Sequence, residues 1–316
     1  MSGRAIVRVA AAVLQRNDGK VLLAQRLPGK PYAGYWEFPG GKLEPAESPH
    51  DALVRELNEE LDITVTRAAR WLTQRYEYPH AHVELDFFRV FEWRGEPRGC
   101  DGQQIAWQHP ANIEVAPLLP ANATVLRALA LPPVYAISMA EDLGEAAFLA
   151  RARAAIGSGL RLIQLREKSF TAERMRQLAE RLLPMAASHG ARVLLNGDAD
   201  FARALGCAGV HWSAARLLTA QTRPDDMLCA ASTHNAAELA QAVKLGVDFA
   251  VLGPVRETPL HPAAHPLGWQ RFSELVHGSP LPVYALGGLS QTDLDAAIAY
   301  GAHGVALRRA AWPAPA

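Results

Sequence analysis

The stretch GGKLEPAESPHDALVRELNEELDI, residues 40–63, decides the fold expected for the first part of the chain. Ser48, followed by Pro49 and then by Asp51, is typical of a helix start, because the hydroxyl can cap the first turn and proline suits the first helical position. An apolar stripe follows at helical spacing: Ala52, Leu53, Leu57 and Leu61. The pattern predicts a helix over residues 49–61 with one buried face.

Acidic residues crowd the second half of this helix. Glu56, Glu59 and Glu60 fall at i, i+3 and i+4, so their carboxylates are expected on one face. Three carboxylates so close raise one another's pKa unless a cation neutralises them. Because the ligand atoms are all oxygen, the expected cation is Mg²⁺, with Mn²⁺ as the alternative. The other interpretation is a solvated acidic face with Arg55 as its partner.

Composition limits the class of protein. The 316 residues are 49% hydrophobic and 20% charged, which is ordinary for a globular chain and long enough for two domains. The net formal charge is zero, so broad attraction to nucleic-acid polymers or to anionic membranes is not expected. The three cysteines form no CxxC pair, and no apolar run reaches membrane-spanning length. These features predict a soluble cytoplasmic protein.

The first part of the chain is rich in predicted strands. Residues 4–14 and 20–25 flank an Asn-Asp-Gly turn, and alternating or aromatic runs follow at 69–78 and 83–93. With helices expected over 49–61 and 124–131, this is a mixed α/β domain over residues 1–131. Pro132 and Pro133 mark the boundary, since proline ends helices and stiffens linkers.

Beyond residue 132 the pattern changes to short apolar runs that alternate with helical segments. The runs are VYAIS (134–138), RLIQLRE (161–167), RVLLN (192–196), GVHW (209–212), LCAAS (228–232), FAVLGPV (249–255), PVYALGG (282–288) and GVALRR (304–309). Eight strands with helical crossovers predict a compact (β/α)8 TIM-type barrel over residues 132–316. Little room for a last helix remains after the eighth run, so whether the barrel closes stays open.

Gly41, Glu47 and the run RELNEELDI (55–63) together resemble the Nudix box of nucleoside-diphosphate-X hydrolases. The resemblance implies that water cleaves a pyrophosphate bond while metal ions are held by the box glutamates and by the Gly40 carbonyl. The carried-over ligands are Glu56, Glu59 and Glu60, one of which also serves as a base. The family's usual glycine near the end of the box is Asp62 here, and aspartate tolerates the positive φ expected there.

Two further segments, WEFPGGK (36–42) and LPANATVLRAL (119–129), resemble the MutT branch, which hydrolyses 8-oxo-dGTP. The resemblance implies that Asn122 reads the oxidised guanine edge, because its amide both donates and accepts. Asp101 takes the place of a further acidic metal or base residue, with a shorter reach than glutamate. The remaining substrate-binding positions are Arg26 for phosphate or sugar, Phe38 near the base, and Glu37, Pro39 and Gly40 beside them.

Each of these assignments has a structural alternative. Asn122 could cap the last helix of the domain. Phe38 could be a core residue, and Arg26 could be a surface strand residue. Pro31 lies in a loop where relatives offer a polar contact, so that contact is expected to be absent.

The second half resembles the superfamily of thiamine phosphate synthase and TenI-type thiazole tautomerase. The matching residues are QLREK (164–168), Asn196, GVH (209–211), STH (232–234), Gly253-Pro254 and GGL (287–289). Most lie at the carboxyl ends of predicted strands, where barrel active sites form. The candidate site comprises Gln164, Arg166 and Lys168, expected to alternate along one strand, with Asn196, His234, Gly287 and Gly288. His234 is the candidate acid/base or a loop or cap residue, and His211 is expected to line the barrel.

Departures from this superfamily bear on activity. Gly197 and Arg216 replace two metal-binding aspartates, and His261 replaces a phosphate-binding lysine. Without both acidic ligands we expect no thiamine phosphate synthase activity, although the neighbouring Asp198 could supply one carboxylate. A thiazole- or thiamine-phosphate-like ligand remains the candidate partner of the barrel, which is either a tautomerase or a non-catalytic binding module.

The combined prediction is a Mg²⁺-dependent hydrolase that converts 8-oxo-dGTP to 8-oxo-dGMP and pyrophosphate. Such an enzyme cleans the nucleotide pool and so protects the fidelity of DNA replication. Two other substrates stay open: a diphosphate of the thiamine pathway, with the barrel handling a related intermediate, and ADP-ribose.

Overall fold

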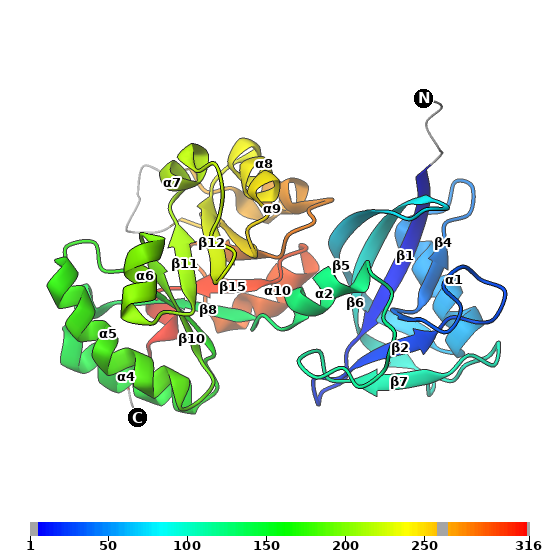
Figure 1. Cartoon of the computed structure of the whole chain (residues 1–316), viewed down its shortest axis with the longest axis horizontal. Helices are drawn as coiled ribbons and strands as arrows, with labels where there is room; N and C mark the ends of the chain where they lie inside the picture. The colour runs from blue at the N-terminus through cyan, green and yellow to red at the C-terminus, as the bar shows by residue number, and fades with distance from the viewer. Residues whose placement is uncertain (1–5, 258–264, 315–316) are drawn as a thin grey trace. The chain divides into compact units, whose positions relative to one another are not determined.

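The computed structural model describes residues 6–257 and 265–314. Contacts between α-carbons divide the chain into two compact units. One consists of Met1–Ala130 with His277–Pro280, and the other of Leu131–Val276 with Leu281–Ala316 (Figure 1). They are called the N-terminal unit and the barrel unit below. The domain ranges drawn from the sequence, 1–131 and 132–316, remain a prediction.

Two sheets form the N-terminal unit. The first has the order β4-β1-β6-β5, and the second has the order β3-β2-β7. β1 runs parallel to β6, from Ile6 opposite His82 to Leu14 opposite Val90. The strands are β1 (Ile6–Leu14), β2 (Val21–Gln25), β3 (Trp36–Glu37), β4 (Gly40–Lys42), β5 (Thr64–Glu77), β6 (His82–Arg94) and β7 (Ile105–Gln108). The predicted strands over 4–14 and 20–25 correspond to β1 and β2, with residues 4 and 5 outside the described part.

Helix α1 (Pro49–Leu61) has the predicted bounds. The Ser48 hydroxyl accepts a hydrogen bond from the Asp51 N–H, so the predicted cap is confirmed. The predicted positive φ of Asp62 is confirmed at 56°, and its N–H donates to the Asn58 carbonyl. All four residues of the apolar stripe are buried: Ala52, Leu53, Leu57 and Leu61. Local sequence signals therefore fix both ends of this helix.

The first sheet is covered by a helix on each face, because side chains alternate along a strand. Ala12 and Leu14 of β1 pack in one apolar cluster with α1. Ala11 and Val13 pack in another cluster with Val125 of α2 (Asn122–Leu129). The unit is thus a mixed α/β sandwich, as predicted.

The barrel unit is a closed barrel of eight parallel strands, so the open question of closure is settled. The strands are β8 (Val134–Ile137), β9 (Leu162–Leu165), β10 (Arg192–Asn196), β11 (Gly209–Trp212), β12 (Leu228–Thr233), β13 (Phe249–Leu252), β14 (Val283–Leu286) and β15 (Gly304–Leu307). The last strand pairs with the first, with Val305 opposite Val134. The helices are α3 (Ala140–Leu143), α4 (Glu145–Gly157), α5 (Ala172–Ala187), α6 (Ala199–Leu205), α7 (Ala214–Thr219), α8 (Ala236–Leu245), α9 (Gly268–Val276) and α10 (Leu294–Ala299).

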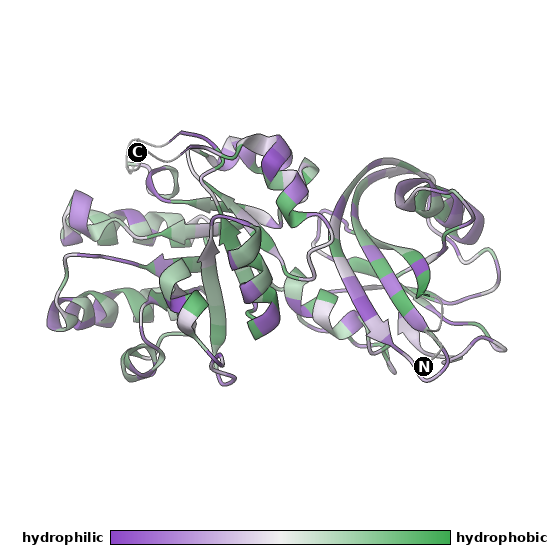
Figure 2. Cartoon of the chain, turned by 90° about the horizontal axis from the view of Figure 1, so that it is seen from above, coloured by the Kyte–Doolittle hydropathy of each residue, from purple (hydrophilic) through white to green (hydrophobic). Residues whose placement is uncertain are grey.

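Aromatic side chains fill the barrel interior. Tyr135, Phe249 and Tyr284 pack with ring centroids 5.2–5.8 Å apart. Hydrophobic residues dominate the barrel strands, and hydrophilic residues recur on the helices around them (Figure 2). A short 3₁₀ turn rather than an α-helix follows β15 in the described residues, and the Trp312 indole then donates to the Ile137 carbonyl at 2.7 Å. None of the helices in the described segments is long and apolar enough to cross a bilayer.

Candidate functional site

The Gly40-Gly41 pair approaches strand β1 very closely. Gly40 has a φ of 144°, and a β-carbon there would lie 2.1 Å from the Ala10 carbonyl oxygen. A β-carbon on Gly41 would lie 2.0–2.2 Å from the carboxyl atoms of Glu56. The backbone of β1 leaves room only for glycine at position 40, whereas a side chain at position 41 would have to displace the Glu56 carboxylate.

Arg55 forms ion pairs with several of the glutamates on and before α1. Its Nε and Nη2 pair with the two carboxylate oxygens of Glu47 at 2.9 and 3.0 Å. Its Nη1 donates to Glu56 at 2.9 Å and to Glu59 at 3.3 Å, and Nη2 also donates to the Lys42 carbonyl. These bonds raise the pKa of Arg55 above its usual value, and the Arg55 bond lowers the pKa of Glu47. The partnership with Arg55 considered from the sequence is therefore present.

Glu60 is the most perturbed carboxylate of the helix. Its pKa is raised to about 7, chiefly by burial, and Lys30, whose Nζ is 3.8 Å away, opposes the rise. The negative charges of Glu56, Glu37 and Asp101 raise that pKa further. The fold thus brings these three predicted site residues into the electrostatic surroundings of Glu60.

The glutamates of α1 do not converge on one point. Glu56 and Glu59 turn toward Arg55, whereas Glu60 faces Lys30. Across residues 6–257 and 265–314 no three His, Cys, Asp or Glu side chains are grouped closely enough to form a ready metal site. The assignment of Glu56, Glu59 and Glu60 as metal ligands stays a prediction.

A short loop places Asp101 beside the end of α1. The Gln103 side-chain amide donates to the Glu60 carbonyl at 2.9 Å, and its oxygen accepts from the Asp101 N–H at 2.9 Å. The Cys100 N–H donates to the same Glu60 carbonyl at 3.0 Å. Sequence reasoning missed Gln103, since an isolated glutamine in a loop carries no signal for this contact.

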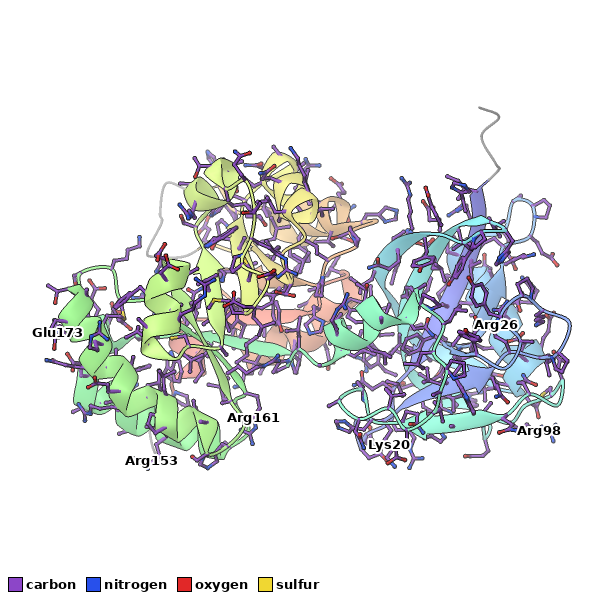
Figure 3. The ribbon with its side chains drawn as sticks, viewed as in Figure 1. Lys20, Arg26, Arg98, Arg153, Arg161 and Glu173 are labelled. Atoms are coloured by element: carbon purple, nitrogen blue, oxygen red, sulfur yellow. The ribbon has the colours of Figure 1, made fainter. Side chains whose placement is uncertain are left out.

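Arg26 follows β2 directly and is mostly buried (Figure 3). Its Nη1 lies 2.6 Å from both carboxylate oxygens of Glu37, and its Nε donates to the Pro31 carbonyl at 2.8 Å. Burial raises the pKa of Glu37, and Arg26 opposes that rise. Arg26 is therefore partly buried and paired with Glu37, its role in binding phosphate or sugar stays a prediction, and the Pro31 carbonyl is one of its partners.

Asn122 is buried at the start of α2, with 2% of its surface exposed. Its side-chain amide donates to the Trp36 carbonyl at 3.3 Å, and the helix has no side-chain cap bond. The capping alternative is therefore wrong. Phe38 is a core residue that meets Phe87 edge-on at 5.9 Å, and the Pro39 carbonyl accepts from Ala12 of β1.

A chain of polar groups runs through the barrel interior. Gln164 donates to the Tyr135 hydroxyl, which lies 3.1 Å from His211 Nδ1. His211 Nε2 lies 2.8 Å from the Ser232 hydroxyl, and Asn196 donates to the His211 carbonyl. Burial, helped by Arg166, lowers the pKa of His211 to about 3. His211 is a neutral residue that lines the barrel, as expected.

Arg166 and Lys168 depart from the predicted arrangement. Strand β9 ends at Leu165, so both lie in the following loop and do not alternate along a strand with Gln164. Burial and the nearby Arg308 lower the pKa of Arg166. Lys168 is exposed.

Glu167, between them, was missed as a structural residue. It is 4% exposed and accepts bonds from the Ser138 hydroxyl and from the N–H groups of Ala140 and Glu141. These bonds hold the loop after β8 to the loop after β9.

His234 lies in the loop before α8. Its Nδ1 is 2.8 Å from Glu238, while Asn235 provides the helix cap. His234 is therefore a loop residue and not the cap. Gly287 and Gly288, with φ of 110° and 65°, lie against Pro254 and Glu257 so closely that a β-carbon at either position would clash.

The structure also shows the contacts of most residues that depart from the metal-binding pattern. Asp198 caps α6 through the N–H groups of Asp200 and Phe201. Gly197 offers no ligand, and Arg216 lies on α7 with its guanidinium 5.9 Å from the Trp212 ring. His261 lies outside the described residues.

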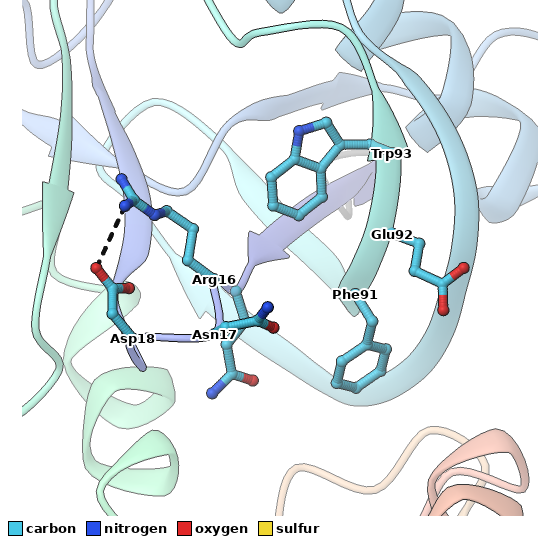
Figure 4. Close-up of a pocket in the computed structure, with 7 residues that line it drawn as sticks. Arg16, Asn17, Asp18, Phe91, Glu92 and Trp93 are labelled. Carbon is cyan, nitrogen blue, oxygen red and sulfur yellow. Dashed lines mark ion pairs between the residues drawn. The ribbon is translucent and has the colours of Figure 1, made fainter.

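One surface hollow of about 560 Å³ lies between residues 15–18 and 91–93 (Figure 4). Phe91 and Trp93 form its apolar part, and Arg16 pairs with Asp18 at 3.4 Å. It contains none of the predicted site residues, so it does not coincide with the acidic site on α1.

Comparison with known proteins gives each half its own relatives. Residues 6–129 match the NUDIX domain model, and residues 134–311 match the thiamine monophosphate synthase model. An 8-oxo-dGTP diphosphatase of Haemophilus influenzae is 38% identical over 124 residues, which is 39% of this chain and 91% of that protein. A CTP pyrophosphohydrolase of Escherichia coli is 39% identical over 123 residues, 39% of this chain and 90% of that protein. A putative thiamine-phosphate synthase of Geobacter sulfurreducens is 34% identical over 178 residues, 55% of this chain and 84% of that protein.

Proposed function

We propose that this chain, which belongs to the NUDIX domain family over residues 6–129 and to the thiamine monophosphate synthase family over residues 134–311, hydrolyses 8-oxo-dGTP to 8-oxo-dGMP and pyrophosphate. The N-terminal unit is a Nudix pyrophosphohydrolase, since full-length relatives of that unit are such enzymes. The choice of the oxidised purine rests on the 8-oxo-dGTP diphosphatases among those relatives and on the buried Asn122 amide.

The observation that carries the proposal is the environment of Glu60. Its carboxylate is largely buried, and the negative charges of Glu37, Glu56 and Asp101 surround it. Crowding of this kind is relieved by a cation, and the oxygen donor set fits a hard divalent ion such as Mg²⁺, or Mn²⁺. We assign its ligands to Glu56, Glu59, Glu60 and the Gly40 carbonyl. When bound, the ion would offset negative charge that develops on the phosphate oxygens.

The protein groups have distinct parts in the proposed reaction. One carboxylate of the set Glu56, Glu59, Glu60 and Asp101 accepts a proton from the attacking water. The water oxygen forms a bond to phosphorus, and the P–O bond to the leaving pyrophosphate breaks. Arg26 uses Nε and Nη1 for protein partners, so Nη2, which has no partner within the described chain, is the group that would meet phosphate or sugar.

Base recognition is assigned to Asn122. Because its amide donates to the Trp36 carbonyl, the side chain is held in one orientation and its oxygen can accept from the protonated N7 of 8-oxoguanine. Plain guanine has no proton at N7, so the same oxygen would stay unpaired. Phe38, Glu37 and Pro39 are assigned as the substrate-binding positions next to Asn122.

A second candidate substrate is CTP. The Escherichia coli relative that bears this activity in its name is as similar to the N-terminal unit as the 8-oxo-dGTP diphosphatase is. A pyrimidine has no N7 and would need contacts other than the one assigned to Asn122. Changing Asn122 is therefore expected to affect hydrolysis of 8-oxo-dGTP and of CTP differently.

For the barrel unit we infer no thiamine phosphate synthase activity. Gly197 and Arg216 carry no acidic ligand, and Asp198 uses its carboxylate to cap α6. Gln164, Arg166, Lys168, Asn196, Gly287 and Gly288 remain the candidate groups for a thiazole- or thiamine-phosphate-like ligand. His234, held by Glu238, is the candidate acid/base if the barrel acts as a tautomerase.

The test is hydrolysis by the full chain with Mg²⁺ of 8-oxo-dGTP, dGTP, CTP, ADP-ribose and thiamine diphosphate, with products separated by chromatography. Glu60→Gln removes the central carboxylate, and Asn122→Ala removes the base contact. Glu44→Gln, on an exposed glutamate in the loop before α1, is the matched control.

Preference for 8-oxo-dGTP that Glu60→Gln abolishes and Asn122→Ala weakens supports the proposal. Equal hydrolysis of dGTP, or preference for CTP or thiamine diphosphate, contradicts the substrate assignment and leaves the pyrophosphohydrolase chemistry intact.

A further inference from the structure

Tyr78, the first residue after β5, has a buried hydroxyl without a hydrogen-bond partner in the described part of the chain. The side chain is only 7% exposed. The hydroxyl lies near the Ala121 backbone but outside normal hydrogen-bond geometry. Native proteins keep few such groups, because each has lost its bonds to water without replacement. An unsatisfied buried hydroxyl is therefore a candidate for a partner that the protein itself does not supply, such as a ligand or an ordered water.

The surroundings of this hydroxyl include residues assigned to substrate binding. Ala121 precedes Asn122 directly, and the charges of Glu37 and Arg26 act on the Tyr78 hydroxyl. Phe38 belongs to the same apolar cluster as Tyr78. The group thus lies among the residues assigned to base and sugar binding, although nothing in the sequence distinguished it.

A second aromatic residue, Tyr32, packs against Tyr78. The ring of Tyr32 meets the ring of Tyr78 edge-on at 5.3 Å and that of Tyr35 at 5.2 Å. Tyr32 has a φ of 58°, a left-handed conformation that is unfavourable for a tyrosine. A residue in a left-handed conformation is therefore packed against the ring that carries the unpaired hydroxyl.

We infer that the Tyr78 hydroxyl is a specificity-determining group that donates a hydrogen bond to a carbonyl oxygen on the base of the nucleoside triphosphate, beside the Asn122 amide. This inference rests on the proposed function of the N-terminal unit. Burial raises the pKa of Tyr78 to about 12, so the hydroxyl keeps its proton at neutral pH and can donate. Guanine, 8-oxoguanine and cytosine carry a ring carbonyl, whereas adenine carries none.

The experiment compares Tyr78→Phe with the parent in the full chain with Mg²⁺, because this change removes the hydroxyl alone. Tyr76→Phe is the matched control, since Tyr76 belongs to the same aromatic group with its ring 4.5 Å from that of Tyr78. We would measure kcat/KM for 8-oxo-dGTP, dGTP, CTP and dATP, together with the melting temperature of each variant.

Loss of one hydrogen bond should lower kcat/KM for the preferred carbonyl-bearing base by about fivefold to tenfold, mostly through KM. Hydrolysis of dATP should stay unchanged, and so should every value for Tyr76→Phe. The melting temperature of Tyr78→Phe should be equal to or above that of the parent, because an unsatisfied buried group has been removed. A structural role would instead lower the melting temperature.

The inference would be overturned if Tyr78→Phe left the ratio of kcat/KM for nucleotides with a carbonyl-bearing base to kcat/KM for dATP unchanged. An equal loss of kcat/KM on all four substrates would overturn it in the same way. If the parent prefers CTP or dGTP to 8-oxo-dGTP, the proposed substrate is wrong. Tyr78 is then still judged by the same ratio, so the two failures are distinguishable.

Discussion

The carboxylate of Glu56 occupies the space that a side chain at Gly41 would need. A β-carbon on Gly41 would lie 2.0 Å from Cδ of Glu56, well inside van der Waals contact. The Gly40-Gly41 turn and helix α1 are therefore fitted to each other through one glycine and one carboxylate. The position of that carboxylate depends on position 41 having no side chain.

Gly41→Ala should displace Glu56 and lower kcat/KM at saturating Mg²⁺ by more than about tenfold. The free energy of unfolding should change little, because the end of the flexible Glu56 side chain can move aside. Gly157→Ala is the control, because Gly157 has open space around its α-carbon. Steady-state kinetics and urea unfolding measure both effects. Full activity in Gly41→Ala would show that the Glu56 carboxylate can move without loss.

Arg55→Gln should make the stability of the N-terminal unit depend more strongly on Mg²⁺ than that of the parent does. The change removes the guanidinium that pairs with Glu47, Glu56 and Glu59, which should lower the free energy of unfolding. A divalent cation bound to the same carboxylates would restore part of the loss, since a ligand of the folded state stabilises it.

The measurement is urea unfolding of the full chain with MgCl₂ and with EDTA. Arg67→Gln is the control, because Arg67 pairs with the exposed Glu92 away from α1. If Mg²⁺ stabilised neither the parent nor Arg55→Gln relative to EDTA, a cation site on the α1 glutamates would be contradicted.

Glu167→Ala should destabilise the barrel by about 2–4 kcal/mol, because it leaves the Ala140 and Glu141 N–H groups and the Ser138 hydroxyl without their acceptor. Thermal unfolding followed by circular dichroism would detect the shift. Glu180→Ala, on an exposed residue of α5, should change the melting temperature little. Equal melting of the two variants would mean that the loop after β8 holds its position without Glu167.

Barrel stability should fall with acid because of His211. Its pKa is about 3 in the folded chain and near 6.5 when unfolded, so between these values only the unfolded state takes up the proton. The contribution of neutral His211 to the free energy of unfolding is therefore complete above pH 6.5. It is lost as pH falls toward 3, by up to about 1.4 kcal/mol per pH unit.

Urea midpoints from pH 7.5 to 4.5 would measure this slope. His211→Gln should flatten it, whereas His189→Gln, on an exposed histidine, should not. Identical slopes in the parent and in His211→Gln would assign the acid sensitivity to other groups.

Features encoded locally were predictable from the sequence. The Ser48 cap, the apolar stripe and the αL position at Asp62 lie within 15 residues, and α1 has the predicted bounds. The alternation of apolar runs and helical segments likewise identified all eight barrel strands.

Features that depend on tertiary pairing were not predictable. Arg26 meets Glu37 because β2 and β3 pair antiparallel, with Ala24 opposite Glu37. Arg166 and Lys168 were placed on a strand because the pattern gives no sign that β9 stops at Leu165. Asn122 also suited a cap, and only the proximity of the Trp36 carbonyl shows its actual partner.

The barrel closes by pairing β15 with β8, so its first strand finds one of its two neighbours only when residues 304–307 exist. The chain leaves the ribosome N-terminus first. One edge of β8 therefore stays unpaired while some 170 further residues are translated. All strands of the N-terminal unit, by contrast, are complete by Gln108. Premature termination between residues 281 and 303 would thus release a complete N-terminal unit attached to an open, aggregation-prone sheet.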